Sequence, residues 1–276
     1  MRIITTISIL FISLSTLFSQ KLPTINDEIT TRFIFHIKDI VEFTDRFNYD
    51  KMSITYKYLS QVANLNNAHR SSFIAAVFNK RIAINEQLKK DFITDVTKYN
   101  KKIEFYDKGW FAVLKTVFSY KGKDQIVLLT LHVNGSKGKA TKWEIVGAYA
   151  PFLEAECTDI PKAKLLTFLS PVSHVTDFVG ISRALEDREN LQNYFADISE
   201  DGILAFKKGL YNNELKFKRV SKITYYFFQI PGWVFTVNFF NDDLSYNTGW
   251  LISSLWKADN LQKDKFKRNE LNLHYD

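Results

Sequence analysis

The sequence of 276 residues contains a single cysteine, Cys157. One thiol cannot form an intramolecular disulfide, which excludes the small folds that depend on several disulfides. No neighbouring residue in the sequence would activate this thiol, so we expect a structural cysteine and not a reactive one. Stability must therefore come from a packed core, and an apolar content of 46% is sufficient for one or two domains.

Motifs that bind metals or phosphates are also missing. The five histidines are scattered, and the patterns H-x-H, HExxH and CxxC do not occur, whereas metal ligands need close spacing. The segment GSKGKAT at 135–141 has two residues between its glycines, where a P-loop has four, and Ala140 follows the lysine. We therefore expect a hairpin loop there, no metal site and no cofactor.

Charge of one sign is not concentrated anywhere in the chain. The net charge is +7, but acidic residues are interspersed with basic ones over most of the sequence. Proteins that bind nucleic acid usually gather Lys and Arg on one face, so we expect no nucleic-acid partner. The basic segment 259–276 is expected to be a charged, solvated C-terminal tail.

Long apolar runs are limited to the N-terminus. Arg2 precedes an apolar stretch over residues 3–18, which Thr and Ser interrupt and which a polar sequence follows. A membrane-spanning helix needs about 20 apolar residues, and this layout is typical of a secretory signal peptide over residues 1–19. We expect a periplasmic or secreted protein without a transmembrane segment after cleavage; an uncleaved anchor is the alternative.

Apolar periodicity divides the remaining chain into helices followed by strands, twice over. In the first half, steps of three and four residues predict helices around 33–47, 71–80 and 84–96, and a period of two predicts strands at 102–109, 110–122, 124–134 and 141–150. In the second half, helices are expected at 169–188, 191–198 and 202–209, and strands at 214–220, 222–230, 233–240 and 249–256.

The last strands of the two halves are similar to each other. TKWEIVGAYA at 141–150 and NTGWLISSLW at 247–256 each place Trp two residues before Ile. We interpret this similarity as two tandem α+β units, 20–152 and 153–258, each with helices followed by a curved four-stranded antiparallel sheet. The alternative is an accidental similarity between two amphipathic strands.

This pattern resembles the NTF2-like group of α+β cone folds, in which helices precede a bent sheet. The segments RFN at 46–48, PVSHVTDF at 171–178, QIPGWVFTVNFF at 229–240 and GWLISSL at 249–255 are similar to segments of uncharacterised secreted proteins of Bacteroidetes-type bacteria. The NTF2-like group includes isomerases, dehydratases, transport adaptors and plain binding modules. The resemblance therefore implies a fold but does not decide the function.

One polar cluster could carry acid–base chemistry. On a helix, Ser173, His174 and Asp177 would lie on one face, where an aspartate could orient an imidazole beside a hydroxyl. The simpler interpretation, which we favour, is that Ser173 caps a helix and Asp177 lies in its first turn, where the helix dipole favours a negative charge.

The open end of a cone fold often forms a pocket, and aromatic residues of the strands could line it. The candidates are Trp110, His132 and Trp143 with Glu144 in the first half, and Tyr226, Trp233 and Trp250 with Asn238 in the second. An isomerase of this architecture would need a carboxylate base facing a Tyr or acid donor. Core packing is the alternative role for these aromatic residues.

No motif in the sequence names a reaction. We therefore expect an exported, non-catalytic protein that binds a small ligand or an envelope protein. A small-molecule acid–base enzyme of the isomerase or dehydratase type, with its pocket in one cone, is the second hypothesis. An envelope binder of glycan or peptide is the third.

Overall fold

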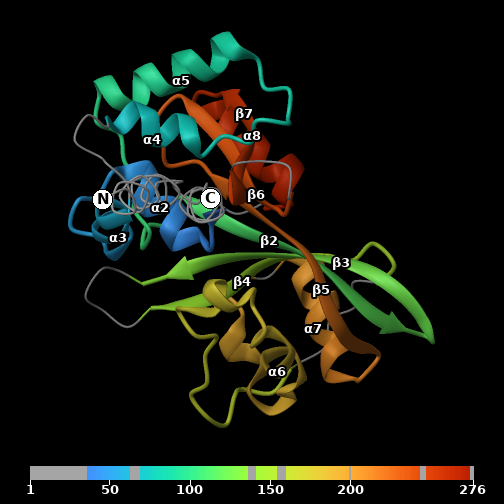
Figure 1. The fold of residues 1–276 in the computed structure, drawn as a ribbon. Coiled ribbons are helices and arrows are strands. Elements are labelled where there is room, and N and C mark those ends of the chain that lie inside the picture. Colours follow the sequence, from blue (N-terminus) through green and yellow to red (C-terminus); the bar gives the residue numbers. More distant parts are fainter. Residues whose placement is uncertain are drawn as a thin grey trace, which may run out of the picture.

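The computed structural model describes residues 36–62, 69–135, 141–153, 160–198, 200–242 and 247–273. The signal peptide predicted at 1–19 and Cys157 lie outside these ranges. The described chain has the predicted α+β class, with helices preceding strands in each half (Figure 1).

The first half begins with a two-residue strand and four helices. They are β1 (His36–Ile37), α2 (Ile40–Asn48), α3 (Ile54–Val62), α4 (Arg70–Ala76) and α5 (Glu86–Lys98). The carboxylate of Asp39 caps α2 by accepting from the Glu42 N–H at 2.9 Å, and Asn85 caps α5 in the same way. Three strands follow: β2 (Trp110–Tyr120), β3 (Lys123–Asn134) and β4 (Lys142–Tyr149).

The second half has the same order with shorter helices. They are the 3₁₀ helices η1 (Ser173–Thr176) and η2 (Arg188–Tyr194), and the α-helices α6 (Ile181–Glu186) and α7 (Asp201–Tyr211). The strands are β5 (Leu215–Phe227), β6 (Trp233–Phe240) and β7 (Thr248–Lys257), and a final helix α8 covers Asn260–Leu271. The single helix predicted at 169–188 is thus divided, because Asp177 and Phe178 have positive φ angles of 49° and 57°.

All strands belong to one mixed sheet of seven strands in the order β1-β7-β6-β5-β2-β3-β4. The prediction of two separate four-stranded sheets is therefore wrong. Two three-stranded meanders, β2-β3-β4 and β5-β6-β7, meet edge to edge because β2 pairs antiparallel with β5 along most of its length. The only parallel pair is β1 with β7 among the strands that the structure describes.

Two strand predictions fail for local reasons. The segment 102–109 forms no strand, because the Gln229 amide bonds both the N–H and the carbonyl of Glu104, at 3.0 and 2.7 Å. The strands predicted at 214–220 and 222–230 are one strand, β5. The break in period at Ser221 is a bulge and not a turn, and the Ser221 hydroxyl donates to the Lys115 carbonyl at 2.7 Å.

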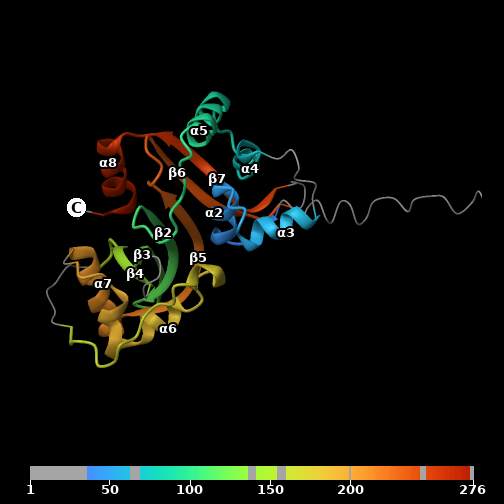
Figure 2. The same cartoon turned by 90° about the vertical axis from the view of Figure 1, so that its left-hand side faces the viewer.

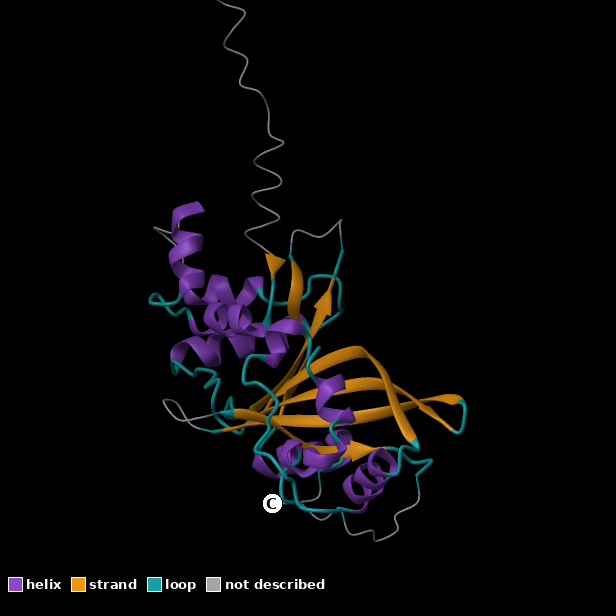
Figure 3. Cartoon of the chain, turned by 90° about the horizontal axis from the view of Figure 1, so that it is seen from below, coloured by secondary structure: helices purple, strands orange, loops and turns teal. Residues whose placement is uncertain are grey.

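The helices cross over between the halves. Phe43 and Phe47 of α2 pack against Phe227 and Phe235 of the second meander, with ring centroids 5.9 and 5.7 Å apart. Phe206 of α7 packs in turn on the first meander. Figures 1 and 3 show the two helical groups at separate ends of the sheet. Each helical group therefore packs on strands of the other half, and α6 and α7 also pack on β5 of their own half.

Both edges of the sheet are covered in the same manner. At the β7 edge, Ile252 forms a parallel bridge with Phe78, and at the β4 edge Ile145 forms one with Phe195. Trp250 and Trp143 stand two residues before these isoleucines, so the similar segments found in the sequence occupy matching places. Covering an edge strand satisfies backbone groups that would otherwise be open to aggregation.

The opposite face of the sheet is covered by α8, which lies away from the other helices in Figure 2. Leu271 and Leu273 pack there with Phe111, Phe228 and Val234. A capping box at Asp259 begins the helix. The segment expected to be a solvated tail therefore includes a packed helix.

Gly249 allows β1 to reach the sheet. Its φ is +88°, and a Cβ added there would stand 2.0 Å from the Ile37 carbonyl oxygen. We expect Gly249→Ala to lower the free energy of unfolding by more than about 3 kcal/mol, through strain and clash together. Gly232→Ala is the matched control, because its φ is +82° but nothing lies within 4 Å. Urea unfolding should give the control a loss of only about 1–2 kcal/mol; equal losses would contradict the clash.

Candidate functional site

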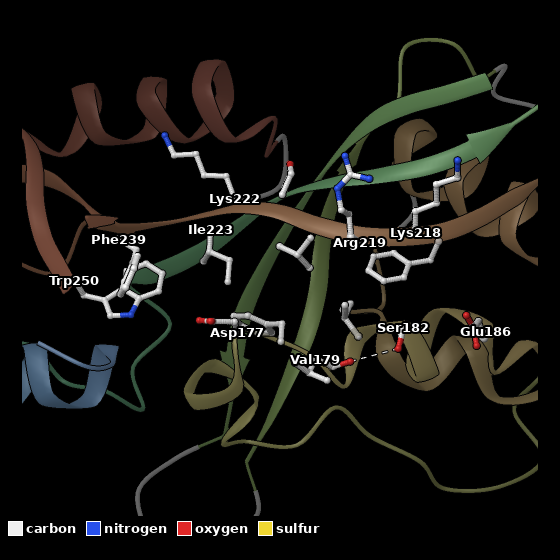
Figure 4. Close-up of a pocket in the computed structure, with 15 residues that line it drawn as sticks. Asp177, Val179, Ser182, Glu186, Lys218, Arg219, Lys222, Ile223, Phe239 and Trp250 are labelled. Atoms are coloured by element: carbon white, nitrogen blue, oxygen red, sulfur yellow. Dashed lines mark hydrogen bonds between the residues drawn. The ribbon is translucent and has the colours of Figure 1, made fainter. Parts of the chain in front are cut away.

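A cleft of about 550 Å³ lies between the η1–α6 segment and strands β5, β6 and β7. Its apolar lining consists mainly of Phe178, Ile181, Ile223, Phe239 and Trp250. Figure 4 shows these elements around the opening. The cleft therefore lies at the border between the strands that α2–α5 cover and the helices of the second half.

The aromatic wall of the cleft is built from neighbouring strands. Trp250 is only 4% exposed, and its ring packs against Phe239 of β6 at 5.6 Å and against Tyr225 of β5 at 4.8 Å. Phe239 is 49% exposed. A large, half-exposed ring beside a buried one is available for contact with a ligand.

Two carboxylates line the cleft, that of Glu186 and, at the aromatic end, that of Asp177. The left-handed backbone that ends η1 at this residue points the side chain toward the Trp250 end of the cleft (Figure 4). Lys222 and Arg219 also border the cleft, but their side chains project from β5 to the other side. Partial burial raises the pKa of Asp177. Among the described residues, Asp177 has no ion-pair partner.

Three buried polar atoms without hydrogen-bond partners lie behind the cleft. Within the described ranges they are both ring nitrogens of His174 and the hydroxyl of Tyr225. His174 packs on Phe105 at 4.9 Å, and Tyr225 pairs across the sheet with Ala112, whose small side chain leaves room for the ring. Buried polar groups are nearly always paired, so each of these atoms needs an explanation.

Burial keeps both side chains neutral. It lowers the pKa of His174 to about 4, although the Asp39 carboxylate opposes this shift. The Pro171 carbonyl also opposes it, but this oxygen accepts from the Trp143 indole at 3.2 Å and makes no well-formed hydrogen bond with the imidazole. Burial raises the pKa of Tyr225 well above its usual value, and the charges of Asp177 and Asp39 add to the effect.

The favoured capping interpretation of the polar cluster is wrong. The Ser173 side chain caps no helix, and Asp177 ends η1 instead of lying in a first turn. The structure places Asp177 on the cleft and buries His174 behind it. The Asp177 backbone N–H donates to the Ser173 carbonyl, but no side-chain hydrogen bond joins Ser173, His174 and Asp177 in the described part of the chain, so they form no relay.

The predicted pocket residues are divided between the two faces of the sheet. Trp110 and Trp143 join Trp250 in the main core, with the indoles of Trp110 and Trp143 5.2 Å apart. His132 and Tyr226 lie on the face that α8 covers. Trp233 belongs to the main core but lies apart from the cleft, and its indole donates to Asp95 at 2.7 Å.

The two polar partners predicted for these pockets are engaged elsewhere. Burial alone would raise the pKa of Glu144, but hydrogen bonds from His132, Lys142 and Asn134 lower it to about 2. Asn238 bonds Thr224 at 2.6 Å and Ser253 at 2.7 Å. Neither residue contributes to the cleft, so of the predicted pocket residues the structure brings only Trp250 to it.

Sequence reasoning missed Tyr225 and chose its neighbour Tyr226. Strand alternation in KITYYFFQI puts the two tyrosines on opposite faces but does not say which face carries the core. Among the described residues, no group of His, Cys, Asp and Glu could hold a metal ion. In the same residues, no helix combines the length and apolar character needed to cross a membrane.

The His174 environment makes stability depend on pH. Because the pKa falls from 6.5 in the unfolded chain to about 4 in the fold, the unfolded state binds more protons between these values. We expect stability to fall by up to about 3 kcal/mol more, as pH drops from 6.5 to 4, in the natural protein than in His174→Phe. Chemical unfolding at several pH values measures this difference, and parallel curves for the two proteins would contradict it.

Comparison with protein-family models, curated proteins and solved structures finds no match for this chain. The resemblance to the NTF2-like group therefore stays a prediction. Any function must be argued from the residues of the site itself.

Proposed function

We propose that this chain is an exported, non-catalytic binding protein that holds a small ligand in the cleft beside Trp250. The cleft carries the proposal. Its volume of about 550 Å³ lies in the range of roughly 300–1,000 Å³ that small-molecule sites occupy, and apolar side chains line it together with polar and charged ones.

The positions of the acid–base groups favour binding over catalysis. General acid–base chemistry needs a base and an acid within hydrogen-bond reach of one reacting atom. His174 and Tyr225 are buried behind the wall, whereas Asp177 lies on the exposed side. These groups therefore do not converge on one point that a ligand in the cleft could occupy.

An acid–base enzyme is the second candidate, because one observation favours it. Tyr225 is neutral, unpaired and close enough to Asp177 for the carboxylate to raise its pKa. A carboxylate and a neutral donor in apolar surroundings could move a proton if the wall between them opened.

Binding of an envelope glycan or peptide through exposed aromatic residues has less support. Four of the five tryptophans are buried, and Trp256 is 39% exposed. Under the same proposal, the cleft binds either a free small ligand or a short segment of an envelope protein.

We also infer that the two halves descend from one NTF2-like unit. The support is positional: Trp143 and Trp250 match, and register shifts fall at Thr130/Leu131 and at Thr236/Val237. In this proposal the two units share one sheet and exchange their helices, instead of enclosing separate cores.

Filling the cleft should abolish binding. Ser182 of α6 lines the cleft, and in Ser182→Phe the ring would occupy its apolar part. We expect Nile red, a neutral dye that brightens in apolar surroundings, to bind the natural protein and to lose at least about tenfold in affinity in this variant. Ser60→Phe on the exposed side of α3 is the control and should bind like the natural protein. No dye binding by the natural protein, or equal binding by all three proteins, would count against the cleft.

A further inference from the structure

We propose that the ligand of this cleft carries an ammonium group, which binds between the Asp177 carboxylate and the rings of Trp250 and Phe239. This inference rests on the proposed binding function and names the chemical class of the ligand. The expected ligand is a small organic cation, such as a quaternary ammonium attached to a short polar chain.

The rings are arranged as walls and not as a stack. Tyr225 is fully buried behind the indole of Trp250, whereas Phe239 and Trp250 both line the cleft with their ring planes at an angle of 65°. Rings tilted in this way present their surfaces in different directions around a concave site. Cations are attracted to the face of an aromatic ring, most strongly to Trp, and such aromatic cages suit quaternary ammonium groups.

The charged residues that line the cleft are the acidic Asp177 and Glu186 and the basic Lys218, Arg219 and Lys222. Asp177 points toward the aromatic end, whereas Lys222 and Arg219 extend from β5 away from it (Figure 4). Asp39 adds a second carboxylate near enough to influence both His174 and Tyr225. Because His174 is neutral at pH 7, it does not offset these charges. At the aromatic end of the cleft, the Asp177 carboxylate therefore favours a cation over an anion.

The Asp177 carboxylate also lacks a counter-charge among the described residues. The residue is exposed, the protein atoms around its carboxylate raise its pKa, and no described cation pairs with it. A ligand ammonium would supply the missing counter-charge at the place where the aromatic rings can also contact it.

Three ligands of the same shape and different charge test the proposal. Choline is the cation, 3,3-dimethylbutan-1-ol is its neutral isostere, and 3,3-dimethylbutanoate is the anion. Titrations of the full mature chain by calorimetry and by tryptophan fluorescence should show choline binding at least about tenfold more tightly than the alcohol, and no binding of the anion.

The Asp177→Asn variant tests the charge without disturbing the backbone. Asn tolerates the left-handed conformation at this position, so the fold should be retained. We expect choline affinity to fall about tenfold or more, whereas affinity for the alcohol stays unchanged. Asp264→Asn, an exposed aspartate on α8, is the matched control and should leave both affinities unaltered. Trp250→Phe should weaken choline binding as well, since Phe is the poorer cation partner.

The outcomes separate this inference from the binding function. If Nile red binds in a Ser182-dependent manner but choline and its isostere bind equally, or the anion binds best, the ammonium proposal is overturned and the cleft remains a binding site. If neither the dye nor any of the three ligands binds, both proposals fail. Unchanged choline binding in Asp177→Asn would also overturn the role of the carboxylate.

Discussion

The antiparallel pairing of β2 with β5 is the contact on which the rest of the structure depends. It joins two meanders that would otherwise be separate sheets, and Trp110 stacks on Phe227 across it at 5.4 Å with parallel ring planes. A continuous sheet of this width has a wide core face, and the helices of one half are too few to cover it. Each helical group packs on strands of the other half, α6 and α7 also pack on β5, and the cleft lies between the η1–α6 segment and strands β5, β6 and β7.

The pairing of β2 with β5 also places Trp143 and Trp250 at opposite edges of one sheet. The two residues occupy matching positions but have different surroundings. Trp143 and Trp250 begin the same bridge pattern at opposite edges of the sheet. Trp143 is enclosed, with Phe178 at 5.0 Å and His174 at 6.0 Å. Trp250 instead borders the cleft, because the residues around it include the exposed Phe239 and the turn at Asp177. The matching position is thus enclosed in one half and borders the cleft in the other.

Hydrophobic periodicity predicted most elements but not their partners. The stripes of α2, α4 and α5 and the alternation of β2, β3, β6 and β7 were readable because each element has one strongly apolar face. Periodicity does not say which apolar face meets which, so the crossing of the helices could not be predicted. The helix α3 was missed because Leu59 is its one buried residue among the side chains described there, which leaves almost no stripe.

Some residues of the candidate site could be named from the sequence, but their arrangement in space could not. Asp177 and Trp250 were candidates from their local patterns, but they lie 73 positions apart in the chain (250 − 177), and both line the cleft because the η1–α6 segment lies beside β5, β6 and β7. Tyr225 was missed because its buried position depends on the small side chain of Ala112 on the facing strand. Nothing in the sequence around Ala112 indicates that these two residues pair. Long-range pairing, which sequence patterns do not encode, therefore decided the geometry of the cleft.

The unpaired groups behind the cleft connect stability with function. Leaving a buried polar atom without a partner costs about 1–3 kcal/mol, so His174 and Tyr225 together lower the stability of the fold. The aromatic core around them offsets that cost, and the imidazole remains uncharged as a result. A protonated or basic group in the same place would cancel the field of Asp39 and Asp177. The neutral core behind the aromatic wall therefore adds no positive charge beside the Asp177 carboxylate.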